Sequence, residues 1–199
     1  MTSLGESTAV KERPVLFSGP MVRAILDGHK TQTRRVVKPQ PPYHAVEVFD
    51  WRAPDIPEAV KAHEGCYYND MDGLNFHCKC PYGGPGDQLW VREAFTVCAD
   101  NNIFYRADGK PDPWDGVRWK PSIHMPRLAS RITLEITGVR VERLQDISEE
   151  DALAEGVTRS ALDPWNRTAF ARLWESINGP DSWDANPFVW VVEFKKVTE

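Results

Sequence analysis

A short run of reactive side chains at 28–35 is the part of this sequence best suited to chemistry. The run carries one amine, two hydroxyls and two guanidinium groups, on Lys30, Thr31, Thr33, Arg34 and Arg35. Amines and guanidinium groups donate charge-assisted hydrogen bonds to anions, and hydroxyls both donate and accept hydrogen bonds. Brought together at one place, such a cluster suits an anion, a nucleic-acid backbone or a polarised carbonyl group.

The residues on either side of this run indicate how it is held in place. Apolar residues at 21–26 recur at helical spacing, Pro20 suits the first turn of a helix, and Gly28 is a favoured residue beyond a helix end. Strand signals resume at 33–37, which ends in the β-branched pair Val36 and Val37. A helix end, a tight turn and a strand start are therefore expected to display these polar side chains close together.

The rest of the sequence predicts more strands than helices. Strands are expected at 14–18, 88–97, 102–106, 131–143 and 188–197. A capping box at Ser148 starts a short helix that ends near Gly156. Asp163 as cap, with Pro164 in the first helical position, starts another. Gly138 is expected at a bulge or bend of its strand. Six or seven strands and three helices without βαβ alternation indicate an α+β fold, a small mixed and mostly antiparallel β-barrel.

The length of 199 residues suits one domain, predicted over 13–199 after a disordered leader at 1–12. Prolines crowd 38–42, and the hydrophobic pattern stays irregular up to Tyr82. A large insertion between strands is therefore expected at about 38–82. The Gly-rich turn at 83–86 lacks the Lys and Ser or Thr of a phosphate-binding loop, so it is interpreted as a turn.

Composition narrows the class of partner. The net charge is −5, which disfavours a protein that coats nucleic acid by charge alone. Cations nevertheless cluster at 30–38 and 118–131, so a local basic site on an acidic body stays open. No run approaches the ~20 apolar residues of a membrane helix, and the start of the chain has no apolar signal-peptide centre. A cytoplasmic protein without a membrane partner is expected, and its oligomeric state is left open.

Four cysteines raise the question of a metal. Cys66, His77, Cys78 and Cys80 form the candidate ligand set. A zinc knuckle prefers paired CxxC spacing, whereas this set holds one CxC and a lone cysteine. Reduced structural thiols are favoured and zinc is the alternative, so no cofactor is expected. Cys98 lies in an expected strand and is interpreted as a small core residue.

Three segments of the chain resemble the ASCH family, a branch of the PUA-like β-barrels associated with RNA and modified nucleosides. They are 28–35 with its Lys-Thr-x-Thr-x-Arg form, the Gly-Asp turn and strand at 86–93, and 136–155 together with the closing strand at 189–194. The segment 119–126 is similar to longer ASCH-containing proteins encoded by bacteriophages and prophages. The resemblance implies a PUA-like barrel that binds a modified nucleoside or RNA.

The resemblance also implies a reaction. A small bacterial amidohydrolase of this superfamily cleaves N4-acetylcytidine to cytidine and acetate with a Lys, a Thr and a Glu, which correspond to Lys30, Thr33 and Glu155 here. Thr33 is then the nucleophile, Lys30 the base and Glu155 the acid/base, as amide hydrolysis requires. Expected substrate contacts come from Thr31, Arg34, Arg35, Glu93, Trp119 and His124.

A non-catalytic RNA- or DNA-binding module of phage origin is the alternative. An open groove lined by Arg34, Arg35, Arg118, Lys120 and Arg127 would favour it. A pocket that buries Lys30, Thr33 and Glu155 within hydrogen-bond reach would favour the hydrolase. A ribonuclease is disfavoured because no pair of histidines is placed for it.

Overall fold

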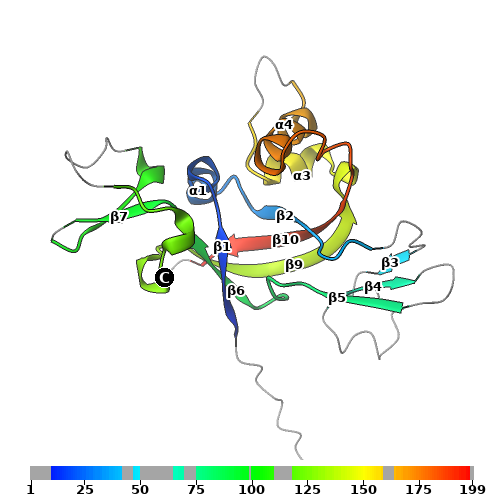
Figure 1. Cartoon of the computed structure of the whole chain (residues 1–199), viewed down its shortest axis with the longest axis horizontal. Helices are drawn as coiled ribbons and strands as arrows, with labels where there is room; N and C mark the ends of the chain where they lie inside the picture. The colour runs from blue at the N-terminus through cyan, green and yellow to red at the C-terminus, as the bar shows by residue number, and fades with distance from the viewer. Residues whose placement is uncertain are drawn as a thin grey trace, which may run out of the picture.

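The computed structural model describes residues 10–41, 47–49, 65–69, 75–98, 100–109, 118–158 and 164–197, with backbone alone at 47–49, 65–69 and 75–78. Its centre is a curved sheet, with α1, α3 and α4 above it in the view of Figure 1. None of the described helices has the length and hydrophobicity needed to cross a bilayer. The predicted leader is described only from Val10, and β1 already begins at Glu12.

The central sheet has five strands in the order β1-β6-β9-β10-β2. These strands are β1 Glu12–Leu16, β6 Gln88–Arg92, β9 Thr133–Arg143, β10 Phe188–Lys196 and β2 Gln32–Val36. β1 and β6 run parallel, and the other three pairs are antiparallel. The predicted α+β class with a mostly antiparallel sheet is therefore confirmed.

The two edges of this sheet meet through a side chain. Among the described residues no backbone ladder joins β1 to β2, but the Arg35 Nη2 of β2 donates to the Leu16 carbonyl of β1 over 2.7 Å. The barrel-like sheet is thus open along the line between β1 and β2. The end of β1 and one face of β2 both line the cavity described below.

Helix α1 (Gly19–Leu26) leads into β2 through the predicted tight turn. Gly28 has a φ of +77°, a left-handed conformation that glycine adopts at little cost. The amides of His29 and Lys30 both donate to the Ala24 carbonyl, over 2.8 and 2.9 Å, which closes the helix end. The expected helix, turn and strand are confirmed, with the strand one residue earlier than predicted.

The strand predicted at 88–97 is two strands in two sheets. It breaks at Glu93 and Ala94, after which β7 (Phe95–Val97) pairs antiparallel with β8 (Ile103–Tyr105). The Glu93 carboxylate is buried against Arg131 instead of facing a neighbouring strand. The Ala94 carbonyl accepts from the Arg106 amide over 2.9 Å, so the chain leaves the central sheet here. The strand predicted at 102–106 is confirmed as β8.

Strand β10 is buried on both faces, which explains its continuous apolar run. Trp190, Val192 and Phe194 face the main core, whereas Val189 and Val191 pack against α3 and α4. The β9–β10 register shifts between Glu193 and Phe194, opposite Gly138, where a bulge was predicted.

Helices α3 (Glu149–Ala154) and α4 (Asn166–Asn178) pack together. The predicted cap of α3 is confirmed, because Ser148 Oγ accepts from the Asp151 amide over 3.0 Å. Helix α4 begins two residues later than expected. Its first amide, of Asn166, donates to the Glu149 carboxylate of α3 over 2.7 Å. Asp163, the predicted cap, lies outside the described residues.

The region of the predicted insertion carries a second, three-stranded antiparallel sheet of β3 (Glu47–Phe49), β4 (Gly65–Asn69) and β5 (Asn75–Lys79). Short 3-10 helices complete the described chain: η1 (Arg106–Asp108), η2 (Ser122–His124), η3 (Arg127–Ala129) and η4 (Leu144–Asp146). The division into leader, domain and insertion stays a prediction.

Candidate functional site

Lys30 and Glu155 form a buried ion pair between the start of β2 and the end of α3. Lys30 Nζ lies 2.8 Å from Glu155 Oε2, and the two residues are 2% and 3% exposed. The same Nζ donates to the carbonyls of Gln32 and Glu155, each over 2.8 Å. These bonds use all three donors of an ammonium group. Burial lowers the pKa of Lys30, although the charge of Glu155 acts in the opposite direction.

The end of α3 explains why this pair forms. The last carbonyls of a helix lack partners within it and carry its negative dipole end. Here the Ala154 carbonyl accepts from the Thr31 amide over 2.9 Å, and the Asp151 carbonyl accepts from Gln32 Nε2 over 2.8 Å. The segment before β2 thus completes the helix end and brings Lys30 to it.

A glycine permits this close approach. Gly156 has a φ of +83°, and a Cβ there would lie 2.9 Å from Ala24 Cβ and 3.0 Å from Lys30 Cβ. Contacts this short are not tolerated without movement of the neighbours. Gly156 therefore lets α1, the turn and α3 converge beside the ion pair.

Arg34 holds the other oxygen of Glu155. Its Nη1 lies 3.2 Å from Glu155 Oε1, its Nε donates to Glu142 over 3.0 Å, and its Nη2 reaches Asp151 over 2.9 Å. The side chain has no exposed surface. Arg34 lines the cavity described below, while its guanidinium donors are engaged by three carboxylates. It orients Glu155, and its role as a substrate contact stays a prediction.

The charge network extends from Glu155 to the edge of the sheet. Arg140 on β9 contacts Glu142 over 3.0 Å, Asp151 over 2.7 Å and also Glu193. Burial acts to raise the pKa of Asp151, but Arg140 and Arg34 outweigh it and hold that pKa below its usual value. Three cations therefore face four carboxylates in one connected group, consisting of Lys30, Arg34 and Arg140 with Glu142, Asp151, Glu155 and Glu193.

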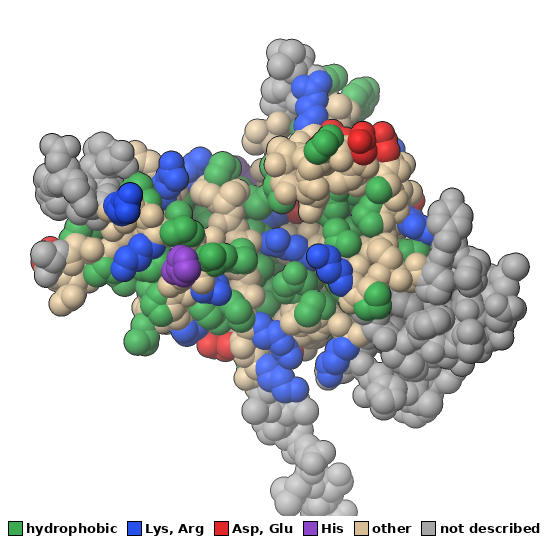
Figure 2. Space-filling view, in the orientation of Figure 1, with side chains coloured by type: hydrophobic (Ala, Val, Ile, Leu, Met, Phe, Trp, Pro, Cys, Tyr) green, Lys and Arg blue, Asp and Glu red, His purple; other side chains and the backbone are tan. Residues whose placement is uncertain are grey.

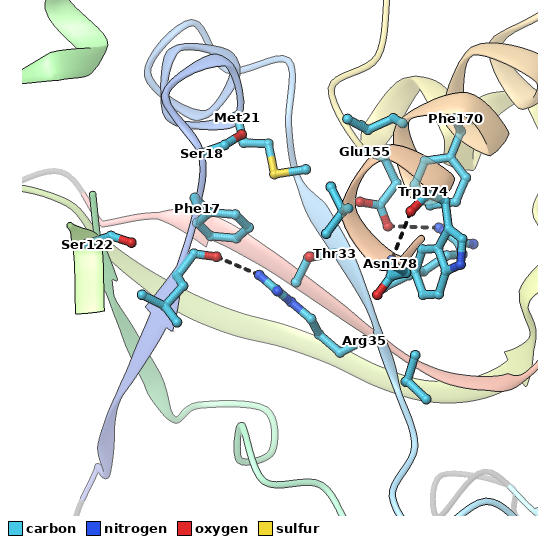
Figure 3. Close-up of a pocket in the computed structure, with 15 residues that line it drawn as sticks. Phe17, Ser18, Met21, Thr33, Arg35, Ser122, Glu155, Phe170, Trp174 and Asn178 are labelled. Carbon is cyan, nitrogen blue, oxygen red and sulfur yellow. Dashed lines mark hydrogen bonds and ion pairs between the residues drawn. The ribbon is translucent and has the colours of Figure 1, made fainter. Parts of the chain in front are cut away.

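A cavity of about 350 Å³ opens beside Glu155, and Figure 3 shows its walls. Its polar wall includes Thr33 and Glu155, and Thr33 lies between Phe17 and Arg35 on one side and Glu155 and Trp174 on the other. Its apolar walls come from the segment between β1 and α1, from α1 and from α4, with Phe17, Met21, Phe170, Leu173, Trp174 and Ile177. Cavities of about 300–1,000 Å³ with mostly apolar walls and a few polar groups are typical of small-molecule sites.

The structure brings together five of the predicted site residues: Lys30, Thr33, Arg34, Arg35 and Glu155. Lys30 has no exposed side-chain surface and is not among the described lining residues, so it reaches the cavity through Glu155. Of the three predicted catalytic residues, Thr33 and Glu155 can therefore contact a ligand in the cavity directly.

Four other predicted contacts do not line this cavity in the described part of the chain. Thr31 is exposed and uses its amide and carbonyl to bind α3 and β10. Trp119 is half-buried elsewhere, and His124 is exposed on η2. Glu93 is 2% exposed and accepts two bonds from Arg131, over 2.9 and 3.1 Å. Burial raises the pKa of Glu93, although Arg131 opposes that change.

Of the five residues of the predicted basic groove, Arg34 and Arg35 line the cavity, whereas Arg118, Lys120 and Arg127 do not. Arg34 is engaged by carboxylates, and Arg127 binds both oxygens of Glu12 over 2.9 Å each. Arg118 and Lys120 are exposed and do not line the cavity.

The supporting charges of Arg140 and Glu142 were not predicted from the sequence. Arg140 and Glu142 share a face of β9 because they are two residues apart, a signal that is visible in the sequence. The sheet order then decides that this face of β9 lies near Arg34 of β2.

The predicted metal ligands fall mostly on side chains outside the described ones. The β4–β5 register pairs Cys66 with Cys78, and Cys80 is buried in the main core. Within the described ranges no group of three or more His, Cys, Asp or Glu side chains is placed to hold a metal ion. The zinc alternative stays a prediction.

Comparison with known proteins adds one distant likeness. No protein-family model matches the chain, and no curated protein sequence is similar to it. A crystal structure of protein EF3133 from Enterococcus faecalis V583, which carries the family designation DUF984, is similar with a TM-score of 0.39 and 11% sequence identity. The match covers 96% of this chain and 82% of that one. A likeness this distant carries no argument about activity, so membership of the ASCH family stays a prediction.

Proposed function

We propose that this chain is an amidohydrolase that removes the acyl group from an N4-acylated cytosine nucleoside. One observation carries the proposal: the Lys30–Glu155 pair is buried, and its carboxylate shares the wall of a ligand-sized cavity with the Thr33 hydroxyl. A buried acid and amine beside a hydroxyl are the groups that acyl transfer to a side-chain nucleophile needs.

The proposed reaction proceeds in two steps. Burial lowers the pKa of Lys30, so its neutral form costs less to reach than that of an exposed lysine, and in that form it accepts a proton. The Thr33 oxygen attacks the acyl carbon, and its proton passes to the Lys30–Glu155 pair. Glu155, which faces the cavity, delivers that proton to the cytosine amino group as the C–N bond breaks. Water then hydrolyses the Thr33 ester, releasing the carboxylic acid and restoring the hydroxyl.

The walls of the cavity support a flat, partly apolar ligand. Phe17, Phe170 and Trp174 offer ring faces or edges, and nucleobases pack favourably on such surfaces. Arg34 fixes one oxygen of Glu155, and Lys30 fixes the other. A carboxylate whose two oxygens are both held loses little conformational entropy when it transfers a proton, and this positioning favours catalysis.

The test is chromatography of N4-acetylcytidine and other N-acylated nucleosides after incubation with the purified chain. We expect cytidine and acetate from the unaltered protein. Thr33→Val and Glu155→Gln should each lower kcat/KM by about 10²–10⁴-fold, the usual contribution of such groups. Thr168→Val removes an exposed hydroxyl on α4 and serves as the matched control. If the unaltered protein cleaves none of the acyl nucleosides, the hydrolase proposal fails and the binding module becomes the better hypothesis.

A further inference from the structure

Strand β2 lies at an edge of the central sheet, and among the described strands it pairs with β10 alone. In an antiparallel pair, every second residue directs its main-chain N–H and C=O to the neighbouring strand, and the residues between direct theirs away. The Val37 amide donates to the Phe188 carbonyl of β10 over 3.0 Å, so the odd-numbered residues face β10. The N–H groups of Arg34 and Val36 therefore point toward the open line between β1 and β2.

The exposed surface of Arg34 belongs to its main chain. The whole residue is 4% exposed, whereas its side chain has no exposed surface. Thr33, Arg34, Arg35 and Val36 all line the cavity, although successive side chains of a strand point to opposite faces. Consecutive residues share one cavity in this way when it runs along the free edge of their strand. The Arg34 N–H is therefore within reach of a ligand in the cavity.

The Arg34 N–H has no acceptor among the described residues. Other main-chain groups along the same open line do have partners. The Gln32 carbonyl accepts from Lys30 Nζ over 2.8 Å, and the Leu16 carbonyl of β1 accepts from Arg35 Nη2 over 2.7 Å. Main-chain donors of buried residues are nearly always paired. An unpaired N–H on the wall of a cavity is therefore suited to an acceptor that a ligand supplies.

This N–H belongs to the residue directly after Thr33, the proposed nucleophile. The two groups are one residue apart in the chain, so both can contact the same acyl group. In hydrolases of the α/β type, the amide of the residue after the nucleophile binds the negatively charged oxygen of the acyl intermediate. Removing one such donor from an enzyme lowers kcat by about 10²–10³-fold. The position of the Arg34 N–H is therefore suited to this task.

The charges around the cavity are compatible with a negative charge on the acyl oxygen. Figure 2 shows Lys and Arg side chains beside hydrophobic ones in the middle of this face. Arg35 Cζ and Lys30 Nζ lie 5.4 and 5.5 Å from the ring centroid of Phe17, which lines the cavity. The carboxylate of Glu155 is on the same wall, and cations hold both of its oxygens. A fixed N–H donor in such buried surroundings stabilises an oxyanion more than it would in water.

We propose that the main-chain N–H of Arg34 binds the acyl oxygen of the substrate and stabilises the negative charge that develops on it. This inference rests on the proposed function for the reaction, whereas the contact itself is measurable without turnover. Attack by the Thr33 oxygen forms a C–O bond and moves the π electrons of the acyl carbonyl onto its oxygen. The Arg34 N–H donates to that oxygen. The carbonyl then re-forms as the C–N bond breaks, and the cytosine amino group takes the proton that Glu155 delivers.

The first test follows the Arg34 amide by NMR in Thr33→Val, which lacks the nucleophile and so leaves the ligand intact. N4-acetylcytidine should move the amide proton of Arg34 downfield and slow its exchange with solvent, because the N–H gains an acceptor. Cytidine has no acyl oxygen and should leave both nearly unchanged. The Val36 amide is the matched control, because it points to the same open line and lies about 7 Å further along the strand. It should respond to neither ligand.

The second test removes the N–H and keeps the side chain. Chemical ligation at Cys66 joins a synthetic 1–65 segment to 66–199, and an ester replaces the amide of Arg34. We expect kcat/KM for N4-acetylcytidine to fall by about 10²–10³-fold relative to the ligated all-amide chain. An ester at Val36 is the matched control, because it also removes an outward N–H and weakens the preceding carbonyl, which faces β10 in both cases. It should retain most of the activity, and thermal unfolding shows that both ester chains are folded.

The outcomes separate this inference from the proposed function. If the chain hydrolyses N4-acetylcytidine and the two ester chains are equally active, the hydrolase stands and the role of the Arg34 N–H is overturned. An Arg34 amide that responds equally to cytidine and N4-acetylcytidine also overturns it. If no acyl nucleoside is hydrolysed but the amide responds to N4-acetylcytidine alone, the hydrolase fails and the contact with the acyl oxygen stands. Absence of both hydrolysis and response overturns both.

Discussion

Replacing Lys30 by methionine tests whether the buried charges are coupled as the structure indicates. Methionine keeps much of the volume of the side chain but removes its charge and three hydrogen bonds. Glu155 then stays buried with Arg34 as its remaining cation, at 3.2 Å. Breaking a buried ion pair by removing one partner costs about 3–5 kcal/mol in free energy of unfolding, because a buried charge is left uncompensated.

The magnitude is measurable by urea denaturation. With a slope of about 2 kcal/mol/M, within the usual range, a loss of about 4 kcal/mol lowers the midpoint by about 2 M. The double variant Lys30→Met with Glu155→Met removes both charges of the pair, and Arg34 keeps Glu142 and Asp151. We expect it to be more stable than Lys30→Met alone, since replacing both members by apolar groups is often close to neutral.

Lys196→Met, at an exposed position of β10, is the control and should change the midpoint little. The reasoning is refuted if Lys30→Met loses less than about 1 kcal/mol, the range of an exposed pair. It is equally refuted if the double variant loses the sum of the two single losses, because independent residues add and coupled ones do not.

Three further predictions concern packing and pH. Gly156→Ala should lower the free energy of unfolding by about 1–3 kcal/mol because its Cβ meets Ala24 and Lys30 in a left-handed conformation. Gly28→Ala, with φ +77° and open space around it, should lose only about 1 kcal/mol; equal losses in thermal unfolding would contradict the packing argument. The lowered pKa of Asp151 contributes stability that is present above its unfolded pKa of about 3.9 and is lost as pH falls through the native value, so Asp151→Asn should flatten the acid limb of a stability–pH curve. Hydrolysis should rise with pH through a pKa below the ordinary lysine value of 10.5, as the neutral fraction of Lys30 grows; a rate that falls over this range would exclude Lys30 as the base.

Local signals predicted the parts of this protein that depend on neighbours in the chain. Gly28 ends a helix because glycine tolerates a left-handed turn, and Ser148 caps α3 because its hydroxyl reaches an amide three residues later. Gly138 lies opposite Glu193, where the register shifts, because glycine is favoured at bulges. The helix, turn and strand that hold Lys30 and Thr33 follow from such signals alone.

Contacts between distant segments were beyond local signals. The alternation at 88–97 continues across Glu93, so nothing local marks the point where the chain leaves the sheet to bury that carboxylate against Arg131. The start of α4 is capped by Glu149 of another helix, which no pattern near Asn166 shows. Both features depend on which elements pack together.

The sequence by itself determined which residues carry chemistry: an amine and a hydroxyl beyond a helix end, and by resemblance a carboxylate far along the chain. Only the tertiary structure decided their surroundings. The order β9-β10-β2 places Glu142 beside Arg34. Lys30 lies next to Glu155 because the last carbonyls of α3 need hydrogen-bond donors, and Lys30 Nζ supplies one. Burial then turns an ordinary lysine into one with a lowered pKa, which is a property of the fold and not of the residue.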